Sequence, residues 1–430
     1  MGAQSLREYH RKPMTQPPTA EAAVALARHL IAAPSPNPPG DERACAAAVD
    51  EALEEFGLPA ATRIARSELR PNLLTTIDFG PGGRHLCLAG HLDTKPVGDA
   101  SWTTDPFEGA VAGDRLYGLG SADMKGAVAA MLVAAARIAA DSPPLGRLSL
   151  LFTADEEDGG AWGAHHLARS GAIACDGIVL GEPGGLHTDF DSLHLVSRGI
   201  ARFHVDVGGD QGHASLSDQS GAVNASVELG RLLVAFAERF TPRQPPRGHP
   251  IRGWHTTVTA GLRLGGGVGY GVVPGQASFS AEVRLLPGMT RSELEEQITE
   301  FVAGEARLNP RLRARLRFDV PPSDFLPATE VATVNPLAVA ARAVCREILG
   351  RVPDDSVFPG TTDAAHLHGL AGIPTLPAFG PGLIAVTHGA DEWVSVEALR
   401  SSVHLYEALV RTYCAEVGPR RPALTPDFLT

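Results

Sequence analysis

Seven acidic and histidine residues that could do chemistry together each follow a short apolar run of this chain. They are His91 and Asp93 in LAGHLDT, Asp123 in GLGSADMKG, Glu156 and Glu157 in LLFTADEEDGG, Glu182 in IVLGEP, and His388 in VTHGADE. Carboxylates and imidazoles bind divalent metal ions, and they also act as general acids and bases. Their types and their placement predict a hydrolytic site that holds two metal ions.

The expected ligands divide between the two ions. Metal ions in such sites lie roughly 3.5–4 Å apart, and Asp123 is the carboxylate that we expect to bridge them. His91 and Glu182 would complete one ion, while His388 and Glu157 would complete the other. Because zinc accepts both imidazole nitrogen and carboxylate oxygen, it is the expected metal, with cobalt and manganese as alternatives.

Two further acidic residues are expected to support the metals without binding them. Asp93 lies two residues after His91, where its carboxylate could accept the second ring N–H and fix the tautomer. Glu156 and Glu157 are neighbours at the end of a predicted strand and point in different directions. One can therefore bind metal while the other faces the water between the ions. Glu156 is the expected general base.

The motifs and their order resemble those of the M20 metallopeptidases and amidohydrolases, a group that includes acetylornithine deacetylase, succinyl-diaminopimelate desuccinylase and glutamate carboxypeptidase. The resemblance covers about residues 21–413. It implies the same ligand set, with Asp123 as the bridge, Asp93 as the residue that orients His91, and Glu156 as the base. It also implies that the peptide bond from Asp123 to Met124 is cis.

The same resemblance assigns roles near the substrate. His213 in GHAS matches a histidine that, in family dimers, reaches the partner subunit's site and stabilises the tetrahedral oxyanion. Asn224 in GAVNA matches a position that helps to hold substrate, and Arg284 in EVRLLPG matches an arginine that grips the substrate carboxylate. Gly360 in PGTTDA is expected near the substrate, where a side chain would crowd it. Plain readings stay open for the first three: an exposed loop histidine, a residue at a helix start and a solvent-facing arginine.

The order of predicted elements indicates an α/β catalytic domain. Strand-like and helical apolar runs alternate from about residue 20 to residue 196, which predicts a mainly parallel sheet covered by helices. Sites on such sheets form at the carboxyl ends of the strands, where the proposed ligands fall. The pattern returns after about residue 321, so we expect the domain over residues 19–197 and 321–418, with mobile segments at 1–18 and 419–430.

The insert at residues 198–320 has its own order of elements. Strands are expected at 201–207, 256–264, 277–285 and 312–320, and helices at 222–240 and 291–302. This β-α-β-β-α-β order is the split βαβ arrangement, an α+β fold. The family resemblance implies a lid domain that closes over the metals and pairs with another subunit. We therefore expect a homodimer through the lid.

Composition limits the partners and the compartment. A formal net charge of −12 argues against nucleic acid or an anionic membrane, so a small substrate that carries a carboxylate is expected. The 5 cysteines are odd in number and far apart, which is untypical of a disulfide framework. The first residues contain no apolar signal core. Together these features favour a cytoplasmic enzyme.

The leading hypothesis is hydrolysis of the amide bond of an N-acyl amino acid. A water that bridges the metals would be activated by Glu156, which would then protonate the leaving amine. A dipeptidase or carboxypeptidase is the alternative, because its substrate is also an amide with a nearby carboxylate. A metal-dependent binding protein without catalysis is more remote, since a binder has no need of a base such as Glu156.

Overall fold

The computed structural model describes residues 16–141, 145–247 and 251–416. These residues form two compact units: among them, unit 1 draws on the described parts of 16–193, 332–354 and 373–416, and unit 2 on those of 194–331 and 355–372. Residues 194–197, 321–331 and 355–372 thus group with unit 2, whereas we expected them in the catalytic domain. Of the segments expected to be mobile, only residues 16–18 lie within the described residues.

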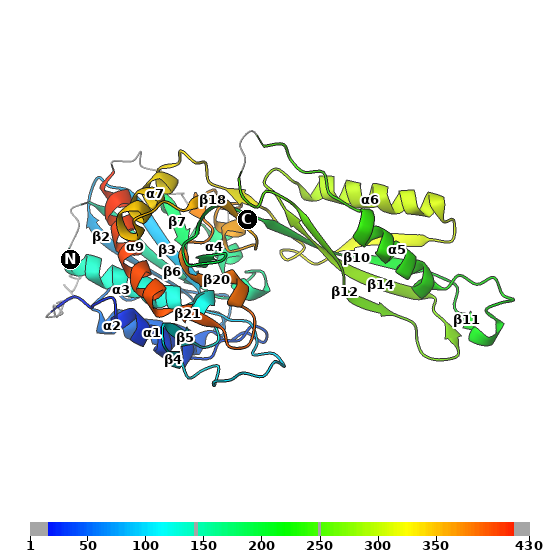
Figure 1. Ribbon diagram of the computed structural model, residues 1–430, viewed down its shortest axis with the longest axis horizontal. Coiled ribbons are helices and arrows are strands. Elements are labelled where there is room, and N and C mark those ends of the chain that lie inside the picture. The colour runs from blue at the N-terminus through cyan, green and yellow to red at the C-terminus, as the bar shows by residue number, and fades with distance from the viewer. Residues whose placement is uncertain (1–15, 142–144, 248–250, 417–430) are drawn as a thin grey trace, which may run out of the picture. The chain divides into compact units, whose positions relative to one another are not determined.

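Unit 1 is built on a six-stranded sheet (Figure 1). In spatial order its strands are β1 (Thr62–Ile64), β2 (Asn72–Gly80), β6 (Gly146–Thr153), β3 (His85–His91), β7 (Gly177–Leu180) and β19 (Thr375–Leu376). Strand β3 pairs in parallel with β6 and β7, and β7 with β19. Strands β1 and β2 add an antiparallel edge that the sequence analysis did not predict. The sheet is therefore mainly parallel only around its centre.

Helices cover this sheet, whose central strands β3 and β6 are buried at nearly every position. Helices α3 (Gly126–Ala140) and α9 (Val396–Ala415) pack against each other and against β3 and β6, and α1 (Ala22–Ile31) and α7 (Pro336–Leu349) pack beside them. Apart from its first residue, every residue of β3 is buried, which requires cover on both faces. Helix α3 is buried on nearly every side.

Short elements complete unit 1. The remaining elements are α2 (Arg43–Glu55), α4 (Ala164–Ser170), the antiparallel strands β4 (Val111–Ala112), β5 (Arg115–Tyr117) and β21 (Trp393–Ser395), and the parallel pair β8 (Pro183–Gly185) and β20 (Gly380–Leu383). The peptide bond between Asp123 and Met124 is cis, as the resemblance implied. No helix among the described residues is long and apolar enough to cross a membrane.

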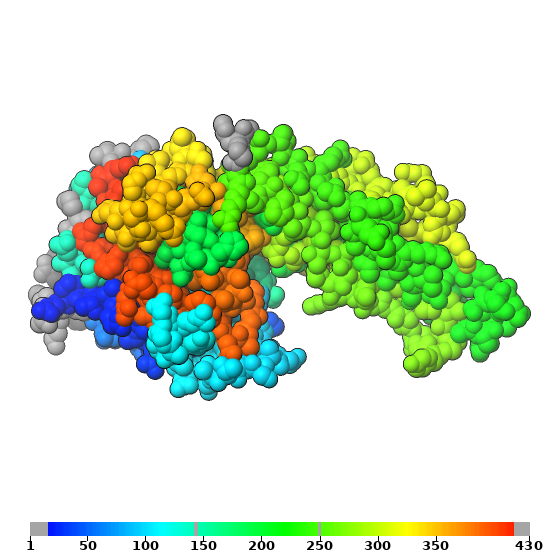
Figure 2. Space-filling view, viewed as in Figure 1, coloured from blue at the N-terminus to red at the C-terminus, as the bar shows by residue number. Residues whose placement is uncertain are grey.

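Unit 2 has the split βαβ order. Its antiparallel sheet runs β12 (Thr257–Gly266), β14 (Gln276–Leu285), β10 (Gly199–Gly208) and β15 (Arg313–Phe318), with α5 (Ala225–Arg239) between β10 and β12 and α6 (Arg291–Leu308) between β14 and β15. Both helices are exposed at the surface of the unit (Figure 2). Shorter elements are β11 (Gly212–His213), β13 (Val272–Val273), β16 (Phe325–Leu326), β17 (Thr329–Glu330), α8 (Ala364–Leu367), and β9 (Ser192–Ser197) and β18 (Asp354–Phe358) at its boundary with unit 1.

The core of unit 2 follows from alternation along its strands. Every second residue of β14 is buried, so one face of the sheet is apolar and meets the helices. Phe236 of α5 packs edge to face on Phe203 of β10, with ring centroids 6.0 Å apart, and lies 5.9 Å from the ring of Phe279. A capping box of Thr290 and Glu293 begins α6. Unit 2 thus has its own hydrophobic core.

Candidate metal centre

The expected ligands of unit 1 gather at one edge of the sheet. His91 is the last residue of β3, Glu157 lies in the helical turn directly after β6, and Glu182 comes two residues after β7. Because these three strands are parallel neighbours, their carboxyl ends meet at the same edge. Asp123 and His388 reach this edge from the segments before α3 and after β20.

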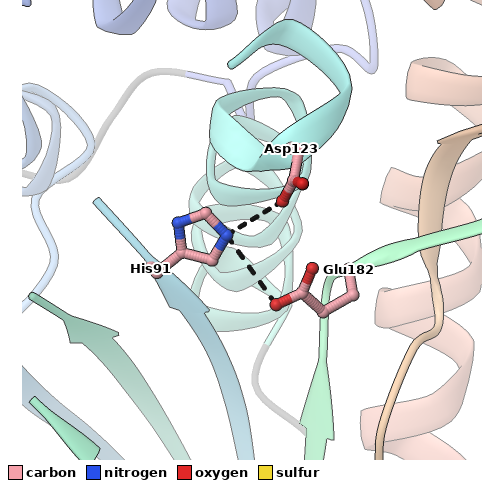
Figure 3. Close-up of side chains that lie close together, drawn as sticks. All are labelled: His91, Asp123 and Glu182. Carbon is pink, nitrogen blue, oxygen red and sulfur yellow. Dashed lines mark hydrogen bonds and ion pairs between the residues drawn. The ribbon is translucent and has the colours of Figure 1, made fainter. Parts of the chain in front are cut away.

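The first of two clusters joins His91, Asp123 and Glu182 (Figure 3). The Nε2 atom of His91 lies 2.9 Å from Oδ1 of Asp123 and 3.7 Å from Oε1 of Glu182. All three residues are buried, and one donor atom of each lies within 4.8 Å of the others. One imidazole nitrogen and two carboxylate oxygens therefore surround a point that a zinc-sized ion could occupy.

The second cluster joins Asp123, Glu157 and His388. Here Nε2 of His388 lies 3.2 Å from Oδ2 of Asp123 and 3.3 Å from Oε2 of Glu157. Asp123 thus turns one oxygen toward each cluster, as a bridging carboxylate must. The structure brings the five expected ligands together in the predicted two groups, and their metal-binding roles stay predictions.

The charges of the clusters fit divalent cations. Burial lowers the pKa of His388, but its contacts with Asp123 and Glu157 outweigh this effect and raise the pKa to about 10. Burial opposes protonation of His91 too, yet Asp123 and Glu182 hold its pKa well above its usual range. Burial and the charge of Asp123 also raise the pKa of Glu182 well above its ordinary value. The carboxylates therefore need positive charge, which metal ions supply in place of protons.

Asp93 contacts the site differently from our expectation. The Nδ1 atom of His91 lies 2.9 Å from the backbone oxygen of Asp93, and the carboxylate Oδ1 is 3.6 Å away. The carboxylate instead accepts the backbone N–H of Glu156 at 3.1 Å and that of Glu157 at 3.0 Å. The Asn37 amide donates to the same carboxylate at 2.8 Å. Asp93 therefore orients the ring through its main chain and holds the two glutamates through its side chain.

Glu156 belongs to neither cluster. Its charge nevertheless contributes to the raised pKa values of both His91 and Glu182, so its carboxylate lies close enough to act on them electrostatically. Glu156 as a residue is partly exposed. This placement suits a base that meets substrate and water.

Lys95 is a residue of the site that the sequence analysis missed. Its Nζ atom lies 3.2 Å from Oε2 of Glu157 and also contacts the backbone oxygen of that residue. The ammonium group is therefore beside the second cluster. The only signal in the sequence was its place two residues after Asp93, directly after the first motif.

The four residues expected near the substrate all lie in unit 2. His213 is exposed, and its Nδ1 lies 2.8 Å from the hydroxyl of Ser215. Asn224 caps α5, because its side-chain oxygen accepts the N–H groups of Ser226 and Val227.

Arg284 and Gly360 lie near Thr361 in the same unit. Arg284 Nε is 2.6 Å from Oε1 of Glu282, and its Nη1 is 3.4 Å from the hydroxyl of Thr361. A β-carbon on Gly360 would come within 2.9 Å of the ring of Phe358, so a side chain there has little room. None of these contacts tests the roles that the resemblance assigned.

Comparisons with known proteins agree with this architecture. The model of peptidase family M20/M25/M40 matches residues 87–412. A succinyl-diaminopimelate desuccinylase of Stenotrophomonas maltophilia is 32% identical over 397 residues, which cover 90% of this chain and 98% of the relative. An M20 family metallo-carboxypeptidase from Sulfolobus solfataricus superposes with a TM-score of 0.72 at 16% identity, covering 91% of this chain and 99% of that one.

A dinuclear metal-binding M20 peptidase from Bacillus subtilis has the same fold, with a TM-score of 0.65 at 16% identity over 92% of this chain and 99% of that one. The family model spans most of the chain and includes every residue of both clusters. The chain therefore belongs to the M20/M25/M40 peptidase family and is a metal-dependent hydrolase that acts on amide bonds.

Proposed function

We propose that this enzyme hydrolyses the amide bond of an N-acyl amino acid. The observation that supports this best is the sharing of Asp123 between two clusters, with Glu156 outside both but next to a ligand. A relative that is 32% identical is named a desuccinylase, so an N-succinyl amino acid is the first substrate to try. Each of the two clusters would hold one divalent ion. Zinc is the expected metal, with cobalt or manganese as alternatives.

The residues of unit 1 have distinct parts in this proposal. When bound, the two ions polarise the amide carbonyl and lower the pKa of water. Glu156 removes the proton of the attacking water and then delivers it to the leaving nitrogen. Asp93 keeps Glu156 in place by accepting its backbone N–H at 3.1 Å. Glu157 stays a ligand because its side chain is directed toward His388, 3.3 Å away.

The residues of unit 2 would bind the substrate. We assign the substrate carboxylate to Arg284, since a guanidinium group presents paired donors to a carboxylate. His213 would donate to the oxyanion that forms on the amide carbon. Asn224 would help to hold the substrate, and its role as helix cap would fix its position. Gly360 would leave room for the substrate beside Arg284.

We further propose a homodimer that forms through unit 2. Strand β12 is an edge of the five-stranded sheet of unit 2, so its outer backbone groups can pair with another chain. Apolar side chains follow this edge: Leu264 is 65% exposed, and Val268 and Tyr270 in the loop after it are 72% and 108% exposed. An exposed edge with apolar side chains favours association.

A substrate panel tests the proposal. The metal-reconstituted enzyme is assayed with N-succinyl, N-acetyl and N-formyl amino acids, and with dipeptides, by release of the free amine. We expect the highest kcat/KM with an N-acyl amino acid, and a large drop when its carboxylate is converted to an amide. Preference for dipeptides would favour the peptidase alternative. Equal activity with and without the substrate carboxylate would refute the proposed deacylase function.

A further inference from the structure

Glu392 is a buried carboxylate that lies outside both clusters. It is 2% exposed and precedes strand β21. Its Oε2 atom accepts the backbone N–H of Gly120 at 2.9 Å. Its Oε1 atom accepts the backbone N–H groups of Ala122 at 2.9 Å and of Asp123 at 3.0 Å. A single side chain thus satisfies three backbone donors in the segment that carries Asp123.

That segment has little regular structure of its own. Asp123 has φ −124° and ψ 86°, and Met124 has φ −140° and ψ 33°, so the backbone is not helical where the shared carboxylate leaves it. The segment is also buried. Buried N–H groups need an acceptor, and here a side chain that is distant in sequence provides it. The position of Asp123 therefore depends on Glu392.

The same residue also links two parts of the site through its main chain. Glu392 follows His388 by four residues, and the backbone oxygen of Glu392 accepts the N–H of Gly118 at 2.9 Å. The chain that carries His388 is thereby joined to the chain that carries Asp123. Within the second cluster, these two residues lie 3.2 Å apart, from Nε2 to Oδ2.

We propose that Glu392 is a positioning residue that sets the separation of Asp123 and His388, and so determines how tightly the second cluster binds its metal ion. The inference rests on the proposed ligand assignment. Groups that orient metal ligands from outside typically contribute a factor of about 10–100 in metal affinity. Glu392 acts here through the backbone of a ligand and does not touch the ion.

The variant Glu392→Gln tests this inference with little change of shape. Its amide nitrogen would face a backbone N–H, either that of Gly120 or those of Ala122 and Asp123, so donors would oppose each other. We expect Zn²⁺ to bind the second site about 10–100-fold more weakly, as measured by titration of the metal-free chain. Unchanged affinity at both sites would overturn the inference.

A matched control is available in unit 2. Glu228 is 3% exposed and accepts hydrogen bonds from Arg231 and Asn309, without a link to either cluster. The variant Glu228→Gln should bind both ions with unchanged affinity. An equal loss in this control would show that a buried carboxylate contributes only through general stability, and would contradict a specific role for Glu392.

Hydrogen exchange separates local positioning from global stability. In metal-free Glu392→Gln, amides of residues 118–125 should exchange faster while those of β3 stay protected. Faster exchange throughout unit 1 would refute the inference, and so would an unchanged exchange rate at residues 118–125. If Glu392→Gln does not fold, both measurements are made on Glu392→Asp, which keeps the carboxyl group but withdraws it by one methylene group.

Failure of the ligand assignment gives a different result. If Asp123→Ala retains both ions, the assignment itself is wrong and the role of Glu392 falls with it. If Asp123→Ala loses metal while Glu392→Gln and Glu392→Asp bind it normally, only the positioning role is wrong.

Discussion

The side chain of Asp93 holds the backbone of Glu156: Oδ1 of Asp93 accepts the N–H of Glu156 at 3.1 Å. Its other oxygen accepts the N–H of Glu157 and an N–H of the Asn37 amide. The proposed base and a proposed ligand therefore share one anchor. A carboxylate suits this place, because its two oxygens accept three N–H groups.

The variant Asp93→Asn should lower kcat by about 10–100-fold, the usual effect of losing a group that orients a metal site. Its amide nitrogen would confront at least one of the three donors, and Glu156 or Glu157 would shift. The exposed pair of Asp78 and Arg147 offers a control, so Asp78→Asn should leave kcat unchanged. Wild-type kcat in Asp93→Asn would contradict the anchoring role.

The variant Glu156→Gln should keep its metal content and lose turnover by about 10²–10⁴, the usual contribution of general acid–base catalysis. The reason is that Glu156 belongs to neither cluster. Asp158 lies in the same turn and is exposed, so Asp158→Asn is the matched control and should remain active. Metal analysis and initial rates test this role. Near-normal turnover in Glu156→Gln would exclude Glu156 as the base.

The variant Asp123→Ala should lose most of its metal, because both clusters lose the same ligand. Replacement of Glu182 by Gln should affect mainly the cluster of His91. Elemental analysis after dialysis against trace Zn²⁺ gives the number of ions per chain. Two ions retained in Asp123→Ala would disprove the shared-ligand arrangement.

The ligand positions were predictable because they depend on local patterns. Continuous apolar runs predict buried parallel strands, and residues that follow such strands converge at one edge of the sheet. His91 and Glu157 follow this rule, since β3 and β6 are parallel neighbours. The antiparallel strand β2 was missed because its outer residues alternate between buried and exposed, which dilutes the apolar signal.

The supporting contacts were not predictable from the sequence. Glu392 binds backbone groups about 270 positions earlier in the chain, and a backbone N–H has no sequence signature. The side-chain amide of Asn37 reaches the Asp93 carboxylate across a separation of 56 positions, and no local pattern marks such a distant pair. Nδ1 of His91 lies nearer to the main-chain oxygen of Asp93 than to its carboxylate, and the spacing of the two residues does not distinguish these two acceptors.

Glu42 should make the metal-free protein less stable as pH rises. Burial raises the pKa of Glu42 from an ordinary value of 4.5 to about 7, with a further rise from Asp93 and an opposing effect of Arg70, which lies 2.6 Å away. Between these two pH values the folded chain holds a proton that the unfolded chain releases, so the free energy of unfolding falls as pH increases.

Urea unfolding at pH 5 and pH 8, in the presence of a chelator, measures this effect. The fall in midpoint from pH 5 to pH 8 should be smaller in Glu42→Gln than in the wild type. Asp41 is the control: its pKa is lowered by Arg43, so its titration lies below this window and Asp41→Asn should keep the wild-type slope. An equal fall in Glu42→Gln and the wild type would show that Glu42 is ionised throughout.

Mixed dimers test the proposed role of His213. If His213 completes the site of a partner subunit, the variants Glu156→Ala and His213→Ala are each inactive for a different reason. In a mixed dimer, one site combines the intact Glu156 of one chain with the intact His213 of the other. Equal mixing makes about half of the dimers mixed, and each has one working site, so about a quarter of wild-type activity should return. Subunit exchange must be shown independently, for example with chains that carry different tags. If exchange occurs and the mixture stays inactive, His213 acts within its own chain or has no part in catalysis.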